Sequence, residues 1–209
     1  ISDWYFVSGQ KIDLDEVRYR NLSKIKGTVP TSILGSDYGR NNQTIKEAFF
    51  RMITSAQEEV LVTTPYFVPD DSILNALKIT AKSGVKVTLL LTEKPDSRTA
   101  YYASQTYFKD LLKSGVEINY YTRGMMHSKT MIIDEAISTV GSTNMDQRSF
   151  NLNAEVNAFM LSKKIAKDLK SNFVYDLKDS YPLTLEMLRR RKWYVKVICS
   201  IARLLAPIL

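Results

Sequence analysis

The spacing of apolar residues first becomes regular at 42–57, where it predicts an amphipathic helix. Apolar side chains return there every three or four positions, which places them on one helical face: Ile45, Ala48, Phe49, Met52 and Ile53. The next apolar run, 60–64, is short and rich in β-branched residues, which is typical of a buried strand. The two patterns together predict a helix that leads into a core strand.

The same alternation of helix and strand patterns continues to residue 121. The predicted helices are 72–82 and 96–113, and the predicted strands are 85–92 and 116–121. Asp70 or Asp71 can cap the first of these helices, and Gly84 and Gly115 follow the two helices as stop signals. A β-α-β-α-β order with tight connections implies a largely parallel sheet covered by helices.

Beyond residue 121 the pattern predicts a hairpin, a further strand and a helix. These are the strands 129–134 and 137–141 with a turn at 135–136, the strand 155–161 and the helix 162–177. No internal repeat is visible in the 209 residues. We therefore expect an α/β protein with a mixed, largely parallel sheet flanked by helices.

Both ends of the chain differ in pattern from the central domain, which we place at 41–180. Residues 1–40 have mixed composition and are expected to be irregular. Residues 181–209 are expected to form a basic amphipathic helix, with Lys192, Lys196 and Arg203 on one face and apolar residues on the other. Two interpretations remain: an anchor on a membrane surface, or a helix docked on the domain core with a solvated basic face.

Composition narrows the classes of function. The chain is 44% hydrophobic and 24% charged, which excludes a wholly disordered or low-complexity protein. The net charge of +7, from 29 basic and 22 acidic residues, favours an anionic partner: nucleic acid, a lipid head group or a phosphate ester. Cys199 is the only cysteine and His127 the only histidine, so a disulfide framework and clustered zinc ligands are excluded.

The start of the sequence carries no targeting signal. The chain begins at Ile1 without a basic and then apolar leader, so we expect a processed N-terminus or a piece of a longer protein. No apolar run reaches about 18 residues, so no membrane-spanning helix is expected.

The residues that can carry chemistry gather around the sole histidine. His127 lies just before the predicted strand 129–134 and Lys129 follows two positions later, so both side chains are expected on one side of the sheet. Imidazole can act as a nucleophile or a proton donor, and an ammonium can neutralise phosphate oxygens. Glu155 offers a carboxylate that can hold the imidazole tautomer.

A lone histidine is more often a surface residue or a hydrogen-bonded core group, and one His-x-Lys pair has little specificity. The full series, however, fixes six identities at set gaps: His127-x-Lys129-x4-Asp134-x6-Gly141-Ser142-x-Asn144. The predicted α/β pattern would present these residues together. This combination favours a functional interpretation.

The series resembles the signature of the phospholipase D superfamily. The segments around it are similar to bacterial cardiolipin synthases: 64–69 (Thr-Pro-Tyr-Phe-Val-Pro), 124–144, 146–150 (Asp-Gln-Arg-Ser-Phe) and 152–155 (Leu-Asn-Ala-Glu). The resemblance covers nearly the whole chain and is weakest in 1–40 and 180–209. It implies a phospholipase D-like sandwich that transfers a phosphatidyl group between two phosphatidylglycerol molecules and releases glycerol, without metal or cofactor.

The family pattern has two His-Lys-Asp motifs and N-terminal membrane helices, whereas this sequence has one motif and no such helices. The chain thus looks like a C-terminal half. The resemblance implies as its partner either a missing N-terminal half that carries the first motif or a second copy in a homodimer. It also implies a peripheral place on the cytoplasmic face of a bacterial cell membrane, with the anionic membrane surface as a further partner and no nucleic acid.

The resemblance implies roles for single residues as well. The first-half histidine is usually assigned as the nucleophile, so His127 would be the general acid for the leaving glycerol and then the base for the incoming hydroxyl. Lys129, Ser142 and Asn144 would contact the phosphoryl oxygens, and Glu155 would orient His127. Asp134 belongs to the catalytic motif with a more structural role.

Two further residues are candidates for a lipid entrance. Tyr66 lies in a loop after a strand and Arg98 opens a helix. Loop packing is the alternative for Tyr66, and ordinary helix surface is the favoured interpretation of Arg98. Met125 and Met126 fit either an acyl channel or core filling. Two other functions remain open: a dimeric single-motif phosphodiesterase or nuclease, and a non-catalytic half that only binds membrane.

Overall fold

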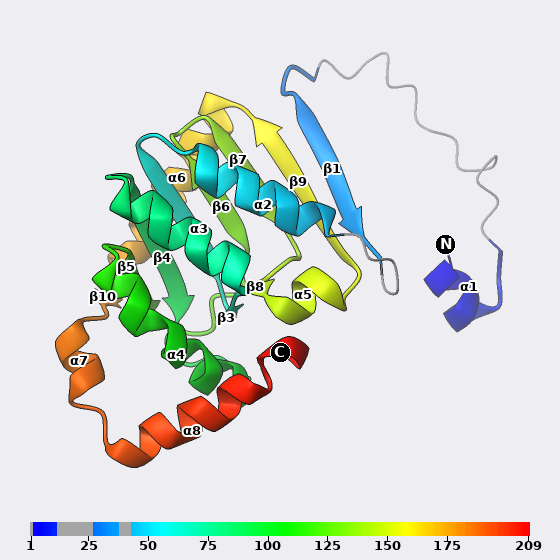
Figure 1. The fold of residues 1–209 in the computed structure, drawn as a ribbon. Helices are drawn as coiled ribbons and strands as arrows, with labels where there is room; N and C mark the ends of the chain where they lie inside the picture. The colour runs from blue at the N-terminus through cyan, green and yellow to red at the C-terminus, as the bar shows by residue number, and fades with distance from the viewer. Residues whose placement is uncertain (1, 12–26, 38–42) are drawn as a thin grey trace.

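The computed structural model describes residues 2–11, 27–37 and 43–209, and its main feature is a large sheet with helices on both faces (Figure 1). Eight strands lie in the order β1-β9-β7-β6-β2-β4-β5-β10. Their bounds are β1 (Thr31–Ser36), β2 (Glu59–Thr64), β4 (Lys86–Thr92), β5 (Glu117–Tyr121), β6 (Thr130–Ile133), β7 (Ile137–Gly141), β9 (Glu155–Leu161) and β10 (Ser180–Pro182). A separate two-stranded pair consists of β3 (Phe67–Val68) and β8 (Met145–Asp146).

The helices form two layers around this sheet. Their bounds are α1 (Ser2–Ser8), α2 (Thr44–Ser55), α3 (Asp71–Lys82), α4 (Arg98–Lys113), α5 (Gln147–Asn151), α6 (Lys163–Leu177), α7 (Leu185–Arg189) and α8 (Trp193–Leu204), followed by the 3-10 turn η2 (Ala206–Ile208). Helices α2, α3 and α4 cover one face of the sheet, and α6 covers part of the other (Figure 1). The expected α/β sandwich is therefore confirmed.

Two apolar clusters hold these layers together. The larger lies between the sheet and α2, α3 and α4, and includes the fully buried Ile53, Leu77 and Phe108. The smaller lies under α6 and includes Leu61, Leu90, Ile132, Ala166 and Phe173. Burial of apolar surface on both faces is the main term that favours this fold.

The pairing directions correct one part of the prediction. The segment from β2 to β5 is parallel as expected, because α3 and α4 return the chain to the start of each next strand. The other five of the seven neighbouring pairs in the large sheet are antiparallel, so the sheet is mixed but not largely parallel. The β6–β7 hairpin causes part of this, with a tight turn in which Asp134 and Glu135 have φ of 50° and 47°.

The flanks also differ from the prediction. Residues 1–40 are not irregular throughout, because β1 pairs with β9 at one sheet edge and α1 is helical; 12–26 and 38–40 lie outside the described residues. The predicted helix at 181–209 is divided into β10, α7 and α8. Pro182 pairs within the sheet, and Thr184 caps α7 by accepting a hydrogen bond from the Met187 N–H.

Helix α8 packs against α4, as the docked interpretation expects, but with an unexpected face (Figure 1). The buried side chains on it are the small Cys199 and Ala202, while the large apolar ones are exposed. Amphipathic periodicity predicts that the apolar residues of α8 share one side of the helix, but it does not predict which side packs against the domain. No described helix is long and apolar enough to cross a bilayer.

Candidate functional site

The predicted site residues, except Asp134, lie at the sheet edge where β2, β4 and β7 end and β6 and β9 begin. Parallel strands commonly place their functional loops at their carboxyl edge. The hydroxyl of Thr92, the last residue of β4, donates a hydrogen bond to the Met126 carbonyl at 2.8 Å. This contact fixes the loop that carries His127 against the end of β4.

His127 and Lys129 are in direct contact. The Lys129 Nζ lies 3.0 Å from Nδ1 and 3.2 Å from Nε2 of His127, and it donates to the His127 carbonyl at 2.8 Å. His127 is exposed, whereas Lys129 is only 9% exposed. Both precede β6, which begins at Thr130, so the loop before the strand rather than the strand itself brings the two side chains together.

The electrostatic surroundings of Lys129 act in two directions. Burial lowers the pKa of its ammonium below the ordinary value, and the nearby carboxylates of Glu155 and Asp146 partly oppose this shift. The net result is a lowered pKa. A poorly hydrated ammonium gains more from contact with an anion such as a phosphoryl group than a fully hydrated one does.

Ser142 and Glu155 form the next part of the site. The Ser142 hydroxyl donates a short hydrogen bond to Glu155 Oε2 and accepts one from the Val156 N–H at 3.0 Å. The other carboxylate oxygen of Glu155 accepts from Asn153 Nδ2 at 3.0 Å. Among the described residues, Glu155 has no hydrogen bond to His127, so its contacts position Ser142 and add negative charge near Lys129.

Asn144 lies in the loop between β7 and β8. Its Nδ2 and its backbone N–H both point to the Ser149 hydroxyl, at 3.2 and 3.3 Å, and its Oδ1 is buried without a hydrogen-bond partner in the described part of the chain. The neighbouring Thr143 donates to Asn157 Oδ1 at 2.6 Å. The loop is thus fixed from both sides next to Ser142.

Asp134 lies at the opposite end of β6 from His127. Its carboxylate accepts hydrogen bonds from the backbone N–H groups of Gln57, Glu58 and Glu59 at 2.8–2.9 Å. Four strand residues, roughly 13 Å at 3.3 Å per residue, separate it from the site edge. Its grouping with the catalytic residues is therefore corrected: the structure gives Asp134 a role in fixing β6 against β2.

The proposed lipid-entrance residues lie in neighbouring loops. The Tyr66 hydroxyl donates a short hydrogen bond to Asp96, and burial, together with this carboxylate, raises the pKa of Tyr66 to about 12. The Tyr66 hydrogen bond lowers the pKa of Asp96, and the charge of His127 adds to this effect, which places the pair near the imidazole. Arg98 is exposed at the start of α4.

Met125 and Met126, the two residues before His127, lie in different surroundings. Met126 is buried in the cluster under α6 and fills the core there, whereas Met125 is exposed.

Sequence reasoning missed Asp96 and Asp146 as parts of this site. Asp146 is buried and caps α5 by accepting from the Ser149 N–H at 2.7 Å. The available signal was its position two residues after Asn144, the end of the motif. Without the loop geometry, however, this position does not indicate that the carboxylate belongs to the site.

The site as a whole is an exposed imidazole beside a shielded ammonium, with hydroxyl and carboxylate groups around them. Such a set can transfer a proton, form a bond to phosphorus and hold phosphoryl oxygens. No cluster of three or more His, Cys, Asp or Glu side chains suited to a metal ion occurs in the ranges that the structure describes.

Solved structures of low sequence identity share this fold. A phospholipase D family member, Nuc from Salmonella typhimurium, matches with a TM-score of 0.63 and 18% identity over 74% of this chain and 99% of its own. The phosphatidylserine synthase of Haemophilus influenzae matches with a TM-score of 0.69 and 14% identity over 89% of this chain and 49% of its own. The molecule is thus an α/β protein of the phospholipase D fold.

Sequence comparison defines the family more narrowly. The family described as "Cardiolipin synthase, PLD-like domain" matches residues 49–177, and the chain belongs to it. Cardiolipin synthases of Halalkalibacterium halodurans and of a Geobacillus species are 42% and 40% identical to it over 209 residues. Cardiolipin synthase 2 of Bacillus anthracis is 38% identical over 211 residues. The whole chain is covered in each case, yet it spans only 41–42% of the length of these relatives.

Proposed function

We propose that this chain supplies one half of a phosphatidyltransferase site that makes cardiolipin from two phosphatidylglycerol molecules and releases glycerol. The observation that carries the proposal is the contact of Lys129 with His127 at an exposed sheet edge. A phosphodiester anion resists attack by a nucleophile. A cation lowers this resistance by neutralising negative charge, and a proton-transfer group beside it helps the leaving oxygen to depart. Because the family relatives are cardiolipin synthases, phosphatidylglycerol is the substrate we assign.

In the proposed reaction, a histidine of the other half attacks the phosphorus of the first phosphatidylglycerol. The P–N bond forms as the P–O bond to the head-group glycerol breaks, and protonated His127 gives its proton to the leaving oxygen. Neutral His127 then takes the proton of the second phosphatidylglycerol hydroxyl, which attacks phosphorus and releases the histidine. Lys129 holds the phosphoryl oxygens throughout, with Ser142 and Asn144 beside them.

The other half is proposed to be an N-terminal half with the first motif, with a second copy of the chain as the alternative. Support comes from the length of the chain relative to its family and from an apolar surface next to the site. Ile33, Val140 and Val156 are exposed on the face of β1, β7 and β9 that α6 leaves uncovered. Val156 lies at the end of β9 where the site is, with its side chain on the opposite face from that of Glu155, so a domain on this surface would reach the site around the end of the sheet.

Further parts of the proposal concern the organisation and location of the protein. We assign the catalytic domain to 41–180 and a membrane-contacting segment to 181–209. We place the protein at the cytoplasmic face of a bacterial cell membrane, peripheral through this segment and anchored by helices of the N-terminal half. A dimeric phosphodiesterase is the second candidate, favoured by the match that covers 99% of the Salmonella phospholipase D family member.

The test is to join the chain to the N-terminal half of the Halalkalibacterium relative and to measure cardiolipin and glycerol from phosphatidylglycerol vesicles. His127→Ala is expected to lower the rate at least about 100-fold. Ser128→Ala, in the same exposed loop, is the matched control and is expected to keep the rate. Cardiolipin formation by His127→Ala at the unmodified rate would refute the assignment.

Two further measurements test whether His127 is the general acid or the nucleophile, and whether the chain is instead a phosphodiesterase. If His127 is the general acid, a phosphatidyl donor with a nitrophenol leaving group is expected to restore the first step in His127→Ala, because nitrophenolate leaves without a proton. No recovery would assign His127 as the nucleophile instead. Cleavage of DNA at low salt by the 209-residue chain alone, lost in Lys129→Ala, would favour the phosphodiesterase.

A further inference from the structure

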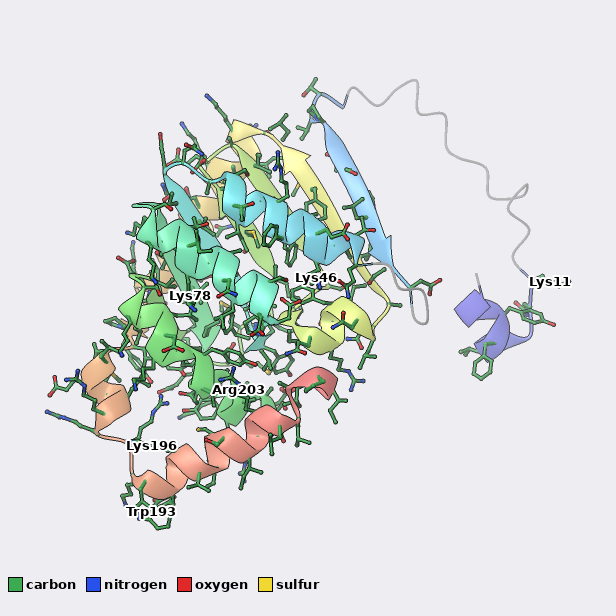
Figure 2. The ribbon with its side chains drawn as sticks, in the orientation of Figure 1. Lys11, Lys46, Lys78, Trp193, Lys196 and Arg203 are labelled. Carbon is green, nitrogen blue, oxygen red and sulfur yellow. The ribbon has the colours of Figure 1, made fainter. Side chains whose placement is uncertain are left out.

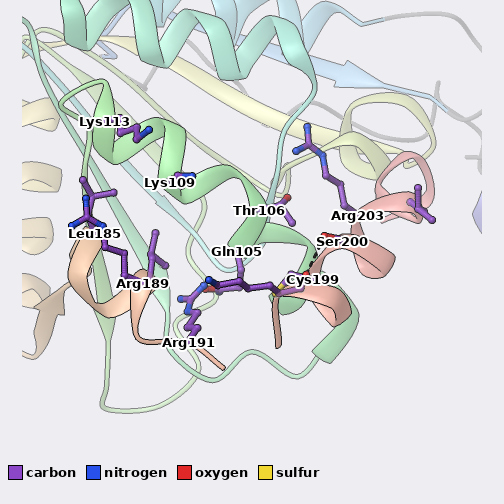
Figure 3. Close-up of a pocket in the computed structure, with 13 residues that line it drawn as sticks. Gln105, Thr106, Lys109, Lys113, Leu185, Arg189, Arg191, Cys199, Ser200 and Arg203 are labelled. Carbon is purple, nitrogen blue, oxygen red and sulfur yellow. Dashed lines mark hydrogen bonds between the residues drawn. The ribbon is translucent and has the colours of Figure 1, made fainter. Parts of the chain in front are cut away.

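A second basic region lies away from the His127 site, in a groove between α4, α7 and α8 (Figure 3). The groove has a volume of about 850 Å³. Its walls carry six basic side chains and no acidic one: Lys109, Lys113, Arg189, Arg191, Lys196 and Arg203. None of the residues proposed for catalysis lines it, so binding in this groove is separate from the reaction.

These cations are not neutralised by the protein itself. None of the six forms a salt bridge with a carboxylate in the described part of the chain. The Arg203 guanidinium is held 4.8 Å from the centre of the Tyr107 ring, which orients it without neutralising it. Figure 2 shows Lys196 and Arg203 on the side of α8 toward α4. A concave surface of one sign attracts and concentrates anions.

The outer side of α8 has the opposite character. We call it the apolar arc; it continues past the end of α8 into η2, and Leu204 lies at its border with the groove. It consists of eight exposed residues: Trp193, Tyr194, Val197, Ile198, Ile201, Leu204, Leu205 and Ile208. Trp193 is 76% and Leu204 79% exposed, and Figure 2 shows Trp193 pointing away from the domain. The helix cannot turn this arc inward without exposing Cys199 and Ala202 and pulling Arg203 from Tyr107.

We propose that the groove binds the phosphate of an anionic phospholipid head group while the apolar arc lies among the acyl chains of the same membrane surface. Charge complementarity selects the occupant, because an anionic lipid offers one ligand with a phosphate for the six cations and hydrocarbon for the arc. Helix α8 has 12 residues, too short to span a bilayer but sufficient to lie in its interface.

The test uses Trp4→Phe, which leaves Trp193 as the only tryptophan, and follows its emission as vesicles are added. Vesicles of phosphatidylcholine with a minority of phosphatidylglycerol are expected to shift the emission to the blue, and pure phosphatidylcholine far less. The groove variant Lys109→Gln/Lys113→Gln/Lys196→Gln is expected to weaken binding about 100-fold, since each basic residue near an anionic surface contributes about fivefold.

The matched control removes the same charge elsewhere, by Lys82→Gln/Lys163→Gln/Lys164→Gln on α3 and α6. These residues are exposed and lie outside the groove. Their loss is expected to change binding only slightly. Equal weakening in both variants would mean that net charge alone attracts the membrane, and it would overturn the groove. Circular dichroism checks that each variant is folded.

Two further arms distinguish other occupants. Millimolar inorganic phosphate is expected to leave vesicle binding in place; if it displaces the chain, the groove is a site for free anions and the lipid proposal fails. In the chain joined to the N-terminal half, Trp193 emission is expected to stay that of an exposed residue until lipid is added. A blue-shifted emission without lipid would show that protein covers the arc, and it would also overturn the proposal.

Discussion

At the scale of single residues, three aspartates show how one side chain serves different ends. Asp134 accepts three backbone N–H groups at the start of β2. Asp70 caps α3 and pairs with Lys46 at 2.9 Å, and Asp146 caps α5 in a buried place beside the site. The surroundings of each carboxylate decide whether its charge stabilises the fold or costs stability.

Replacing Asp134 by Ala is expected to lower the free energy of unfolding by about 2–4 kcal/mol, because three N–H groups lose a charged acceptor. Asp134→Asn keeps one acceptor oxygen and tolerates the positive φ of 50°, so it is expected to lose less. Urea unfolding measures both. A loss of activity by Asp134→Ala in fully folded protein, with stability unchanged, would return Asp134 to the catalytic group.

Asp146 and Asp70 are expected to give opposite pH dependences. Burial raises the pKa of Asp146 despite hydrogen bonds from Ser149, so the folded state binds the proton more tightly than the unfolded state. Its contribution to stability therefore falls as pH rises from about 4 through the raised pKa. Burial of Asp70 is outweighed by hydrogen bonds from Ile73, Ser72 and Lys46, so its pKa is lowered. Its contribution is complete above about pH 4 and is lost as pH falls through the lowered pKa.

The measurement is urea unfolding of Asp146→Asn and Asp70→Asn at several pH values, relative to the unmodified chain. Asparagine can cap a helix, so the charge is the main change. Asp146→Asn is expected to gain in relative stability as pH rises from 4 to 7. Asp70→Asn is expected to lose relative stability as pH rises toward about 4, and then to change little from 4 to 7, so the series includes values below pH 4. Parallel curves for the two variants would contradict both assignments.

At this scale the sequence predicted the contact at the centre of the candidate site. The His-x-Lys spacing placed His127 and Lys129 on one side, and their contact bears this out. The spacing could not show that Asp134 lies away from the site. Residues of one sequence motif can lie at opposite ends of a strand, and the spacing alone does not say where the strand begins and ends. It also could not find Asp96, whose link to Tyr66 depends on how two loops meet.

At the scale of elements, the approach of β7 to β9 shapes the loop that carries Ser142. Gly141 lies opposite Asn157, and a Cβ on Gly141 would overlap the Asn157 side chain and the Val156 carbonyl. Asn157 is buried and holds Thr143, the residue after Ser142. The glycine therefore permits the close contact that positions the motif loop.

Gly141→Ala is expected to destabilise the chain by about 3 kcal/mol, because the backbone and a buried side chain cannot both move aside. Gly35→Ala on β1 is the control, since a Cβ there meets only the Glu155 carbonyl at an ordinary 3.7 Å. Alanine is favoured over glycine in a strand, so this control is expected to be neutral or slightly stabilising. Thermal unfolding compares them; equal Tm values would refute the close approach.

Most elements could be predicted because their signals are local. The capping residues Asp70, Ser97 and Ser162 all accept a backbone N–H at the predicted helix starts. The division of 181–209 and the facing of α8 could not be predicted, since both depend on what packs against the segment. The available signal for the side of α8 that packs on another helix was the periodic series of small residues Cys199, Ala202 and Ala206.

At the scale of the whole molecule, the two faces of the sheet are unequally covered. Helix α6 covers the middle of one face (Figure 1). On the same face, Ile33, Val140 and Val156 of the strands β1, β7 and β9 stay exposed. Clusters of exposed apolar side chains commonly mark interfaces. This surface is where the proposed other half would complete the site.

Val156→Glu is therefore expected to lower cardiolipin formation at least about 10-fold when the chain and the N-terminal half of the relative are mixed as separate proteins. An unpaired charge buried at the interface is the cause. Val174→Glu on α6 is the control, at a similarly exposed valine on another surface. Equal rates for the two variants at limiting concentration would argue against an interface on this face.

The close contact of α8 with α4 has a kinetic consequence. Because Cys199 and Ala202 seat the helix on the domain, rather than leaving it on a loose tether, a chain held by α8 would meet its substrates by lateral diffusion in two dimensions. Turnover would then follow the mole fraction of phosphatidylglycerol in the bilayer and not its bulk concentration. Dilution with neutral lipid would slow the enzyme even at constant total substrate.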